Sequence, residues 1–142
     1  MRFYRPTFAE IDLSAIRHNL EIVSHIVKGD TKILGVVKAD AYGHGIKEVS
    51  KTIVDYVDYF GVASLDEAAI LRRTGIQKPI LIMGAILPEE IEGVLKFNVI
   101  QTVSDMGIPK RLSKLAQSMN KKVKVHVKID TGIGRLGFWH GE

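Results

Sequence analysis

Residues 32–64, KILGVVKADAYGHGIKEVSKTIVDYVDYFGVAS, contain one complete strand–helix–strand pattern, and this stretch decides the fold class. The run from Lys32 to Lys38 is short, apolar and rich in β-branched residues, and a second run of this kind begins at Tyr59. Between the two runs, apolar residues recur at helical spacing: Ile46, Val49, Ile53 and Val57. Strands that are apolar on both faces and alternate with helices indicate a buried parallel sheet.

The same alternation continues along the chain. Further strand-like runs begin at Pro79, Val99 and Val123, and helical patterns cover residues 14–27, 64–75, 88–97 and 104–120. In the second of these, Ser64 is expected as the N-cap, with Glu67 as its capping-box partner and Gly75 as the stop. The spacing of the strands is that of the (β/α) units of a TIM barrel. We therefore predict an α/β fold of the (β/α)8 TIM-barrel type, with an open doubly wound sheet as the alternative.

The composition is typical of a soluble globular protein, with 46% hydrophobic and 25% charged residues. The formal charge of +4 is spread along the chain, which argues against nucleic acid as a partner. The absence of cysteine excludes disulfides and thiolate metal sites, and no other pattern suggests a metal. No stretch resembles a signal peptide or a membrane span, so we expect a cytoplasmic protein without a membrane partner.

Five strands cannot close an eight-stranded barrel, so the predicted barrel is incomplete. We expect residues 1–142 to be the N-terminal portion of a larger protein, or one half of a split or swapped assembly.

Reactive groups of α/β folds gather where the strands end, and Lys38 ends the first strand. A partly desolvated lysine at such a place can act as a nucleophile or a base, although most lysines there simply reach water. Gly43 and Gly45 would let backbone N–H groups approach an anion at the start of the next helix. His44 is expected to be structural or solvent-facing.

In the fifth strand the residue types alternate. One face carries Val123, Val125, Val127 and Ile129, and the other carries Lys124, His126 and Lys128. The valines are expected to face the helices and the lysines a polar lumen, while an edge strand with one wet face is the alternative. The loop that follows contains a literal G-x-G-x-x-G, but no dinucleotide-binding unit surrounds it. Asp130 and Thr131 are expected to cap this turn, and Arg135 either holds an oxyanion such as a phenolate or is solvated.

Two motifs together, VVKADAYGHG (36–45) and KIDTGIGRLG (128–137), closely resemble the alanine racemase family. Supporting similarity lies in AEIDLSAIRHN (9–19) and VASLDEAAILR (62–72), so the resemblance covers essentially the whole chain. It implies a TIM-like barrel paired with a β-domain, pyridoxal 5'-phosphate as cofactor, and a homodimer that acts in the cytoplasm on alanine. A related decarboxylase also has a lysine after the first strand, but the paired motifs favour the racemase.

The resemblance also implies residue roles. Lys38 matches the lysine that forms the Schiff base with the cofactor and serves as one of two proton-transfer bases. Tyr42 matches the tyrosine that hydrogen-bonds the cofactor phosphate. Arg135 matches the arginine that contacts the phenolic oxygen of the cofactor and positions the opposing tyrosine. Lys128 matches a lysine that is often carbamylated and holds that arginine.

The implied reaction removes the α-proton of an amino acid on one face and returns a proton on the other. The second base would be a tyrosine of the partner's β-domain, and these 142 residues contain neither that domain nor the later barrel strands. The isolated chain is therefore expected to be inactive. A non-catalytic cofactor-binding or assembly fragment is the alternative, and the range of amino-acid substrates stays open.

Overall fold

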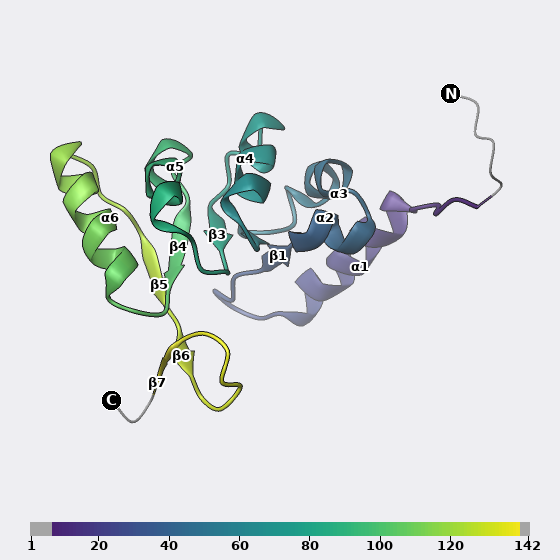
Figure 1. Cartoon of the computed structure of the whole chain (residues 1–142). Coiled ribbons are helices and arrows are strands. Elements are labelled where there is room, and N and C mark those ends of the chain that lie inside the picture. The colour runs from purple at the N-terminus through teal and green to yellow at the C-terminus, as the bar shows by residue number, and fades with distance from the viewer. Residues whose placement is uncertain (1–6, 140–142) are drawn as a thin grey trace.

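The computed structural model describes residues 7–139, and its main feature is a sheet of five parallel strands with helices between them (Figure 1). The strands are β1 (Leu34–Val36), β2 (Tyr59–Val62), β3 (Ile80–Ile82), β4 (Ile100–Val103) and β5 (Val125–Val127). The helices are α1 (Leu13–Ile26), α2 (Lys38–Gly43), α3 (Ile46–Ile53), α4 (Leu65–Arg73), the 3-10 helix η1 (Pro88–Glu90), α5 (Ile91–Lys96) and α6 (Gly107–Ser118). A short parallel pair follows β5, formed by β6 (Ile129–Asp130) and β7 (Phe138–Trp139).

The order of the strands in the sheet is β1-β2-β3-β4-β5, and every neighbouring pair is parallel. Each strand therefore lies beside the strand that precedes it in the chain. An open doubly wound sheet would instead reverse its order at a switch point. The prediction of a barrel-type series is confirmed, and the doubly wound alternative is wrong.

One face of the sheet packs against the helices. The strand register places Phe60 opposite Ile80, and Ile82 opposite Gln101, so these side chains share this face. Phe60, Ile80, Ile82 and Gln101 are all completely or almost completely buried. Gly35 lies on the same face, where a Cβ atom would come within 3.0 Å of side chains in and after α3. The core of the described chain is thus the layer between the sheet and its helices.

The predicted alternation along the fifth strand is confirmed by the register. Val125 pairs with Gln101 on the helix-facing side, while His126 pairs with Thr102 on the opposite side. However, Val125, His126 and Val127 are all exposed, because β5 is an edge of this sheet. This agrees with the alternative of an edge strand, but both of its faces are exposed and not one alone. A polar lumen in a closed barrel stays a prediction.

The start of α4 follows the sequence signals with one difference. Ser64 caps α4 by accepting the Glu67 N–H at 3.4 Å, as predicted. The Glu67 carboxylate does not complete the expected capping box with Ser64, because it accepts the backbone N–H groups of Ala63 and Ala39 instead. No helix in residues 7–139 is long and apolar enough to cross a bilayer.

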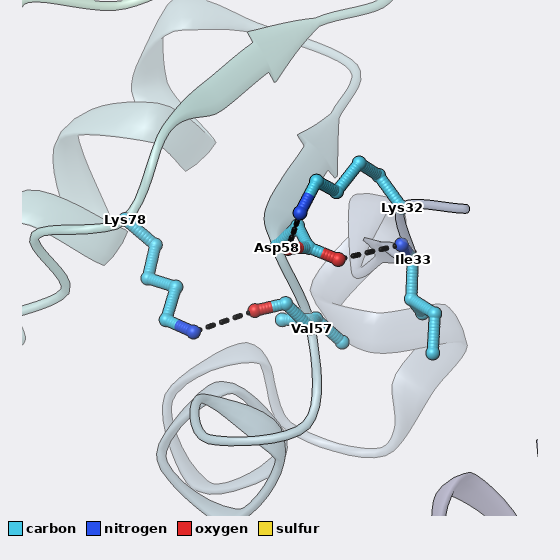
Figure 2. Close-up of polar contacts among 5 residues, drawn as sticks. All are labelled: Lys32, Ile33, Val57, Asp58 and Lys78. Carbon is cyan, nitrogen blue, oxygen red and sulfur yellow. Dashed lines mark hydrogen bonds and ion pairs between the residues drawn. The ribbon is translucent and has the colours of Figure 1, made fainter. Parts of the chain in front are cut away.

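Charged side chains hold the amino-terminal ends of the first three strands (Figure 2). The Asp58 carboxylate accepts the Ile33 N–H at 2.9 Å and lies 3.3 Å from the Lys32 ammonium. The Lys78 ammonium donates to the Val57 carbonyl at 2.7 Å. The hydrogen bond from Ile33, with support from Lys32, lowers the pKa of Asp58 below its ordinary value, because both interactions favour the charged form.

Arg72, at the end of α4, binds four backbone carbonyls near the amino-terminal ends of β3 and β4. Its acceptors, at 2.8–3.0 Å, are the carbonyls of Ile76, Lys78, Phe97 and Asn98. Partial burial lowers the pKa of Arg72, but a guanidinium still stays charged at every physiological pH. The planar fork of donors suits this cluster of carbonyls, and it ties two αβ loops to one helix.

Candidate functional site

Lys38 lies two residues beyond the last residue of β1, at the carboxyl edge of the sheet, and it is half-buried. The four residues after it, Ala39 to Tyr42, all have φ between 51° and 55°. They form a left-handed helical turn, which costs about 1–2 kcal/mol per non-glycine residue. The sequence signals pointed only to a glycine-flanked turn at residues 43–45, and the left-handed geometry of residues 39–42 was missed. A strained turn of this kind persists only where surrounding contacts enforce it.

Several hydrogen bonds enforce the turn from within. Ala41 N–H donates to the Val37 carbonyl, and Gly45 N–H donates to the Asp40 carbonyl, both at 2.9 Å. The Asp40 carboxylate accepts the Ile46 N–H at 2.7 Å, so it occupies the first amide of α3. The expected anion site at this helix start is therefore partly filled by the chain itself.

His44 has the structural role expected of it. Its Nδ1 lies 2.9 Å from the Ala41 carbonyl, to which it donates, so the imidazole also closes the left-handed turn.

Tyr42 is the last residue of the left-handed turn, and 60% of its side-chain surface is exposed. It borders a shallow hollow of about 200 Å³ between α1, β1 and α3. Within the described residues its hydroxyl has no hydrogen-bond partner. The turn therefore presents an amine and a phenol, those of Lys38 and Tyr42, from positions four residues apart.

The second candidate motif forms a loop around Asp130, whose side chain is only 8% exposed. Its carboxylate accepts Gly132 N–H at 2.9 Å and Arg135 N–H at 3.1 Å. These backbone N–H groups, led by that of Gly132, hold the pKa of Asp130 below its ordinary value. The predicted cap at Asp130 is confirmed, whereas Thr131 is exposed and makes no side-chain hydrogen bond within residues 7–139.

The three glycines of the loop have the conformations that their positions predicted. Gly132, Gly134 and Gly137 all have positive φ. At Gly137 a Cβ atom would lie 2.5 Å from the Asp130 nitrogen, so only glycine allows β7 to approach β6 this closely. The glycines thus shape a turn around a carboxylate, and no phosphate-binding helix follows them in the described chain.

Lys128 and Arg135 lie on either side of this loop. The Lys128 backbone joins the main sheet to the β6–β7 pair, since its N–H donates to Val103 and its carbonyl accepts from Phe138. Its side chain is half-buried, and the Arg135 side chain is exposed. In the part of the chain that the structure describes, no hydrogen bond or ion pair joins the side chains of Lys38, Tyr42, Lys128 and Arg135 to one another.

The four residues therefore fall into two groups. Lys38 and Tyr42 lie after β1, Lys128 and Arg135 lie after β5, and three strands separate the two groups in the sheet. Among residues 7–139, no three His, Asp or Glu side chains gather in a way that could hold a metal ion. A primary amine, a phenol and a guanidinium suit an anionic organic ligand with a reactive carbonyl better than a metal.

The structure also gives Glu67 a second role, whereas the sequence signals assigned it only a capping role. Glu67 connects the turn after β1 with the loop after β2 through its two carboxylate oxygens. The capping-box pattern identified the residue, but no local signal could indicate a bond to Ala39, 28 residues away in the chain.

Comparison with known proteins gives a consistent result. Residues 11–142 match the family model described as "Alanine racemase, N-terminal domain". Alanine racemase 1 of Caldanaerobacter subterraneus subsp. tengcongensis is 47% identical over 135 residues, which are 94% of this chain and 35% of that protein. Alanine racemase of Halothermothrix orenii is 43% identical, over 96% of this chain and 36% of that protein.

Solved structures agree with the sequence relatives. The alanine racemase of Clostridium difficile 630 in complex with cycloserine has a TM-score of 0.91 and 41% identity, over 97% of this chain and 38% of that chain. The alanine racemase of Bacillus anthracis with bound L-Ala-P has a TM-score of 0.84 and 34% identity, over 99% of this chain and 36% of that chain. The present chain thus spans about a third of the length of the curated relatives that it matches.

Proposed function

The chain belongs to the family of the alanine racemase N-terminal domain, and on that premise we propose that it carries part of the active site of a pyridoxal-phosphate enzyme that interconverts L- and D-alanine. In this proposal residues 1–142 form the N-terminal portion of the barrel. Further barrel strands, a β-domain and a partner subunit complete the site. A cytoplasmic location and a homodimer are parts of the same proposal.

The observation that carries the proposal is the half-buried residue Lys38, which lies beyond the carboxyl end of β1 and is followed by a strained turn. Donors from both groups of candidate residues fit the parts of pyridoxal phosphate. A primary amine suits its aldehyde, the Tyr42 hydroxyl suits its phosphate, and the Arg135 guanidinium suits its phenolate oxygen. In the described residues these three side chains have no internal partner, which leaves their polar atoms available to a ligand.

In this proposal each residue has a defined task. Lys38 would hold the cofactor through its amine and, once the substrate amine has replaced it there, the freed lysine would move a proton at the α-carbon of the substrate. Tyr42 and Arg135 orient the cofactor by donating to its phosphate and to its phenolic oxygen. When bound, the cofactor supplies an electron sink that makes the α-proton acidic. Because inversion needs a base on each face, a second base must come from outside these residues.

Lys128 is proposed as a carbamylated lysine that supports Arg135. Its half-buried position beside the Asp130 loop brings its backbone next to that of the segment that presents Arg135. A carbamate would replace a positive charge by a negative one and so attract the guanidinium. Intact-mass measurement under conditions that preserve carbamates should reveal the added mass of carbon dioxide.

A second candidate function is a non-catalytic role in assembly, and the exposed edge of β5 favours it. An unpaired parallel edge can accept a strand from a complementary half of a barrel. In that case the chain would bind its other half but not the cofactor.

The experiment that separates these functions is addition of pyridoxal phosphate to the chain. We expect a new absorbance band from a lysine-bound cofactor, and after borohydride reduction mass spectrometry should locate the cofactor on Lys38. Lys38→Ala should abolish the band. Lys47→Ala, which removes an exposed lysine of α3, should leave it unchanged. A wild-type chain without the band would contradict cofactor binding and favour the assembly role.

A further inference from the structure

One carboxylate connects two of the loops that form the carboxyl edge of the sheet. Glu67 Oε1 accepts the N–H of Ala39 at 2.6 Å, and its Oε2 accepts the N–H of Ala63 at 2.7 Å. Ala39 directly follows Lys38 after β1, and Ala63 follows the end of β2. Glu67 itself is half-buried in the first turn of α4. Three separate elements therefore meet at this side chain.

Both amides find their acceptor outside their own strands. The ladder between β1 and β2 ends where Val37 N–H donates to the Gly61 carbonyl, and at Ala39 the chain enters the left-handed turn. An N–H group that leaves a ladder without water or another partner costs about 1–3 kcal/mol. An ionised carboxylate is the strongest acceptor that the protein can offer to such groups.

The turn is thus fixed from both ends by carboxylates. Asp40 binds the amide of Ile46 beyond the turn, and Glu67 binds the first amide of the turn. Asp40 belongs to the turn and would move with it, whereas Glu67 is anchored on α4. Glu67 therefore ties the left-handed conformation to α4, in addition to the tie that Asp40 makes to α3.

We propose that Glu67 is a positioning residue for Lys38. By fixing the amide directly after Lys38, it fixes the direction in which the lysine side chain leaves the sheet, and it couples that direction to the loop after β2. This inference rests on the proposed function only in that the oriented amine is the one that binds pyridoxal phosphate. The orientation itself needs no ligand.

A simple helix-capping role predicts a different pattern of bonds. A capping-box glutamate binds the backbone of its own N-cap residue and stabilises only its own helix. Glu67 instead accepts the N–H of Ala63, the residue before the N-cap, and the N–H of Ala39 in another loop. Loss of a mere cap would lower stability without changing the side chain of Lys38.

The test compares Glu67→Ala and Glu67→Gln with Asp66→Asn. Asp66 is exposed in the same helical turn, so its variant also removes one negative charge near the helix start. The first measurement is the χ1 distribution of Lys38 from three-bond NMR couplings, without cofactor. We expect a single rotamer in the wild type and in Asp66→Asn, and averaged couplings in both Glu67 variants.

The second measurement is the yield of borohydride-trapped pyridoxal phosphate on Lys38 relative to the exposed Lys47 of the same molecule. We expect this ratio to fall by about fivefold in the Glu67 variants, as for loss of one hydrogen bond, and to stay unchanged in Asp66→Asn. Glu67→Gln keeps the size of the side chain, so it still tests whether Glu67 positions Lys38 if Glu67→Ala does not fold.

Two other outcomes have distinct meanings. If Lys38 keeps its single rotamer in a folded Glu67 variant, the positioning role is wrong and Glu67 is only a structural contact. If the wild type shows no preference for Lys38 over Lys47, the proposed function fails, while the couplings still decide whether Glu67 orients the lysine.

Discussion

The two ends of the five-stranded sheet use charged side chains in opposite ways. At the amino-terminal end, Lys32, Asp58, Lys78 and Arg72 all bind the backbone or one another. At the carboxyl-terminal end, the carboxylates of Glu67 and Asp130 bind backbone N–H groups, but the cations do not share these bonds. Within residues 7–139, the side chains of Lys38 and Arg135 have no polar partner.

This difference separates stability from chemistry. Side chains that bind the backbone or one another hold the strands in register, and the groups that make these bonds are not free to bind a ligand. Unpartnered cations beside a firmly bonded backbone contribute little to stability, yet they are placed to bind an anion. In barrels of this type, residues at the amino-terminal face serve stability and those at the carboxyl-terminal face serve function, which agrees with this division.

The largest effect on stability is expected for a change at the amino-terminal end of the sheet. Arg72→Ala should lower the free energy of unfolding by about 3 kcal/mol, because four carbonyls of two loops, with three of the bonds partly buried, lose a charged donor. Urea unfolding followed by circular dichroism measures this loss. Arg73→Ala, which removes the exposed neighbouring arginine, is the matched control and should change stability by less than about 0.5 kcal/mol. Equal losses of stability in the two variants would contradict the stabilising role given to the amino-terminal end of the sheet.

An intermediate effect on stability is expected for a change of Asp130. Because the fold lowers the pKa of Asp130, its ionised form contributes stability that is fully present above the pKa of an unfolded aspartate, about 3.9. This contribution is lost as the pH falls through the lower pKa of the folded state.

The difference in unfolding free energy between wild type and Asp130→Asn should therefore be largest near neutral pH and shrink in acid. Unfolding curves from pH 7 to pH 3 measure it, with the exposed Asp66→Asn as control. A difference that stays constant over this range would show that the carboxylate does not organise the loop.

The smallest effect on stability is expected for the unpartnered cation of the carboxyl-terminal end. Arg135→Gln should change the free energy of unfolding by less than about 0.5 kcal/mol, because its guanidinium makes no described bond. The same variant should weaken binding of pyridoxal phosphate, measured by absorbance titration. A loss of stability comparable to that of Arg72→Ala would mean that Arg135 has a structural role.

Much of the fold could be predicted from local patterns. The five strands, the N-cap at Ser64 and the positive φ values of the loop glycines follow from hydrophobic period and turn chemistry, which act over a few residues. The alternation of Val125 and His126 was also predicted, because a strand turns successive side chains to opposite faces.

The site was predicted less completely. The sequence indicated Lys38, Tyr42, Lys128 and Arg135 as candidates, and their roles stay proposals. It did not indicate that residues after Lys38 would form a left-handed turn, since alanine and tyrosine disfavour that conformation and aspartate usually adopts it only as a single residue. It also predicted that the Glu67 carboxylate would bind at the N-cap Ser64, whereas it binds the amides of Ala39 and Ala63. A capping pattern describes only contacts within its own helix.

The sequence by itself determined the order of strands and helices along the chain, the family and the chemical types of the candidate residues. These properties depend on neighbours within a few positions of the chain and on the motifs that such neighbours form. Only the tertiary structure decided between a barrel-type series and a doubly wound sheet, and only it showed the four carbonyls around Arg72 and the bridge from Glu67 to the turn that bears Lys38. Each of these joins residues far apart in the chain, and such a contact exists only after packing has brought separate elements together.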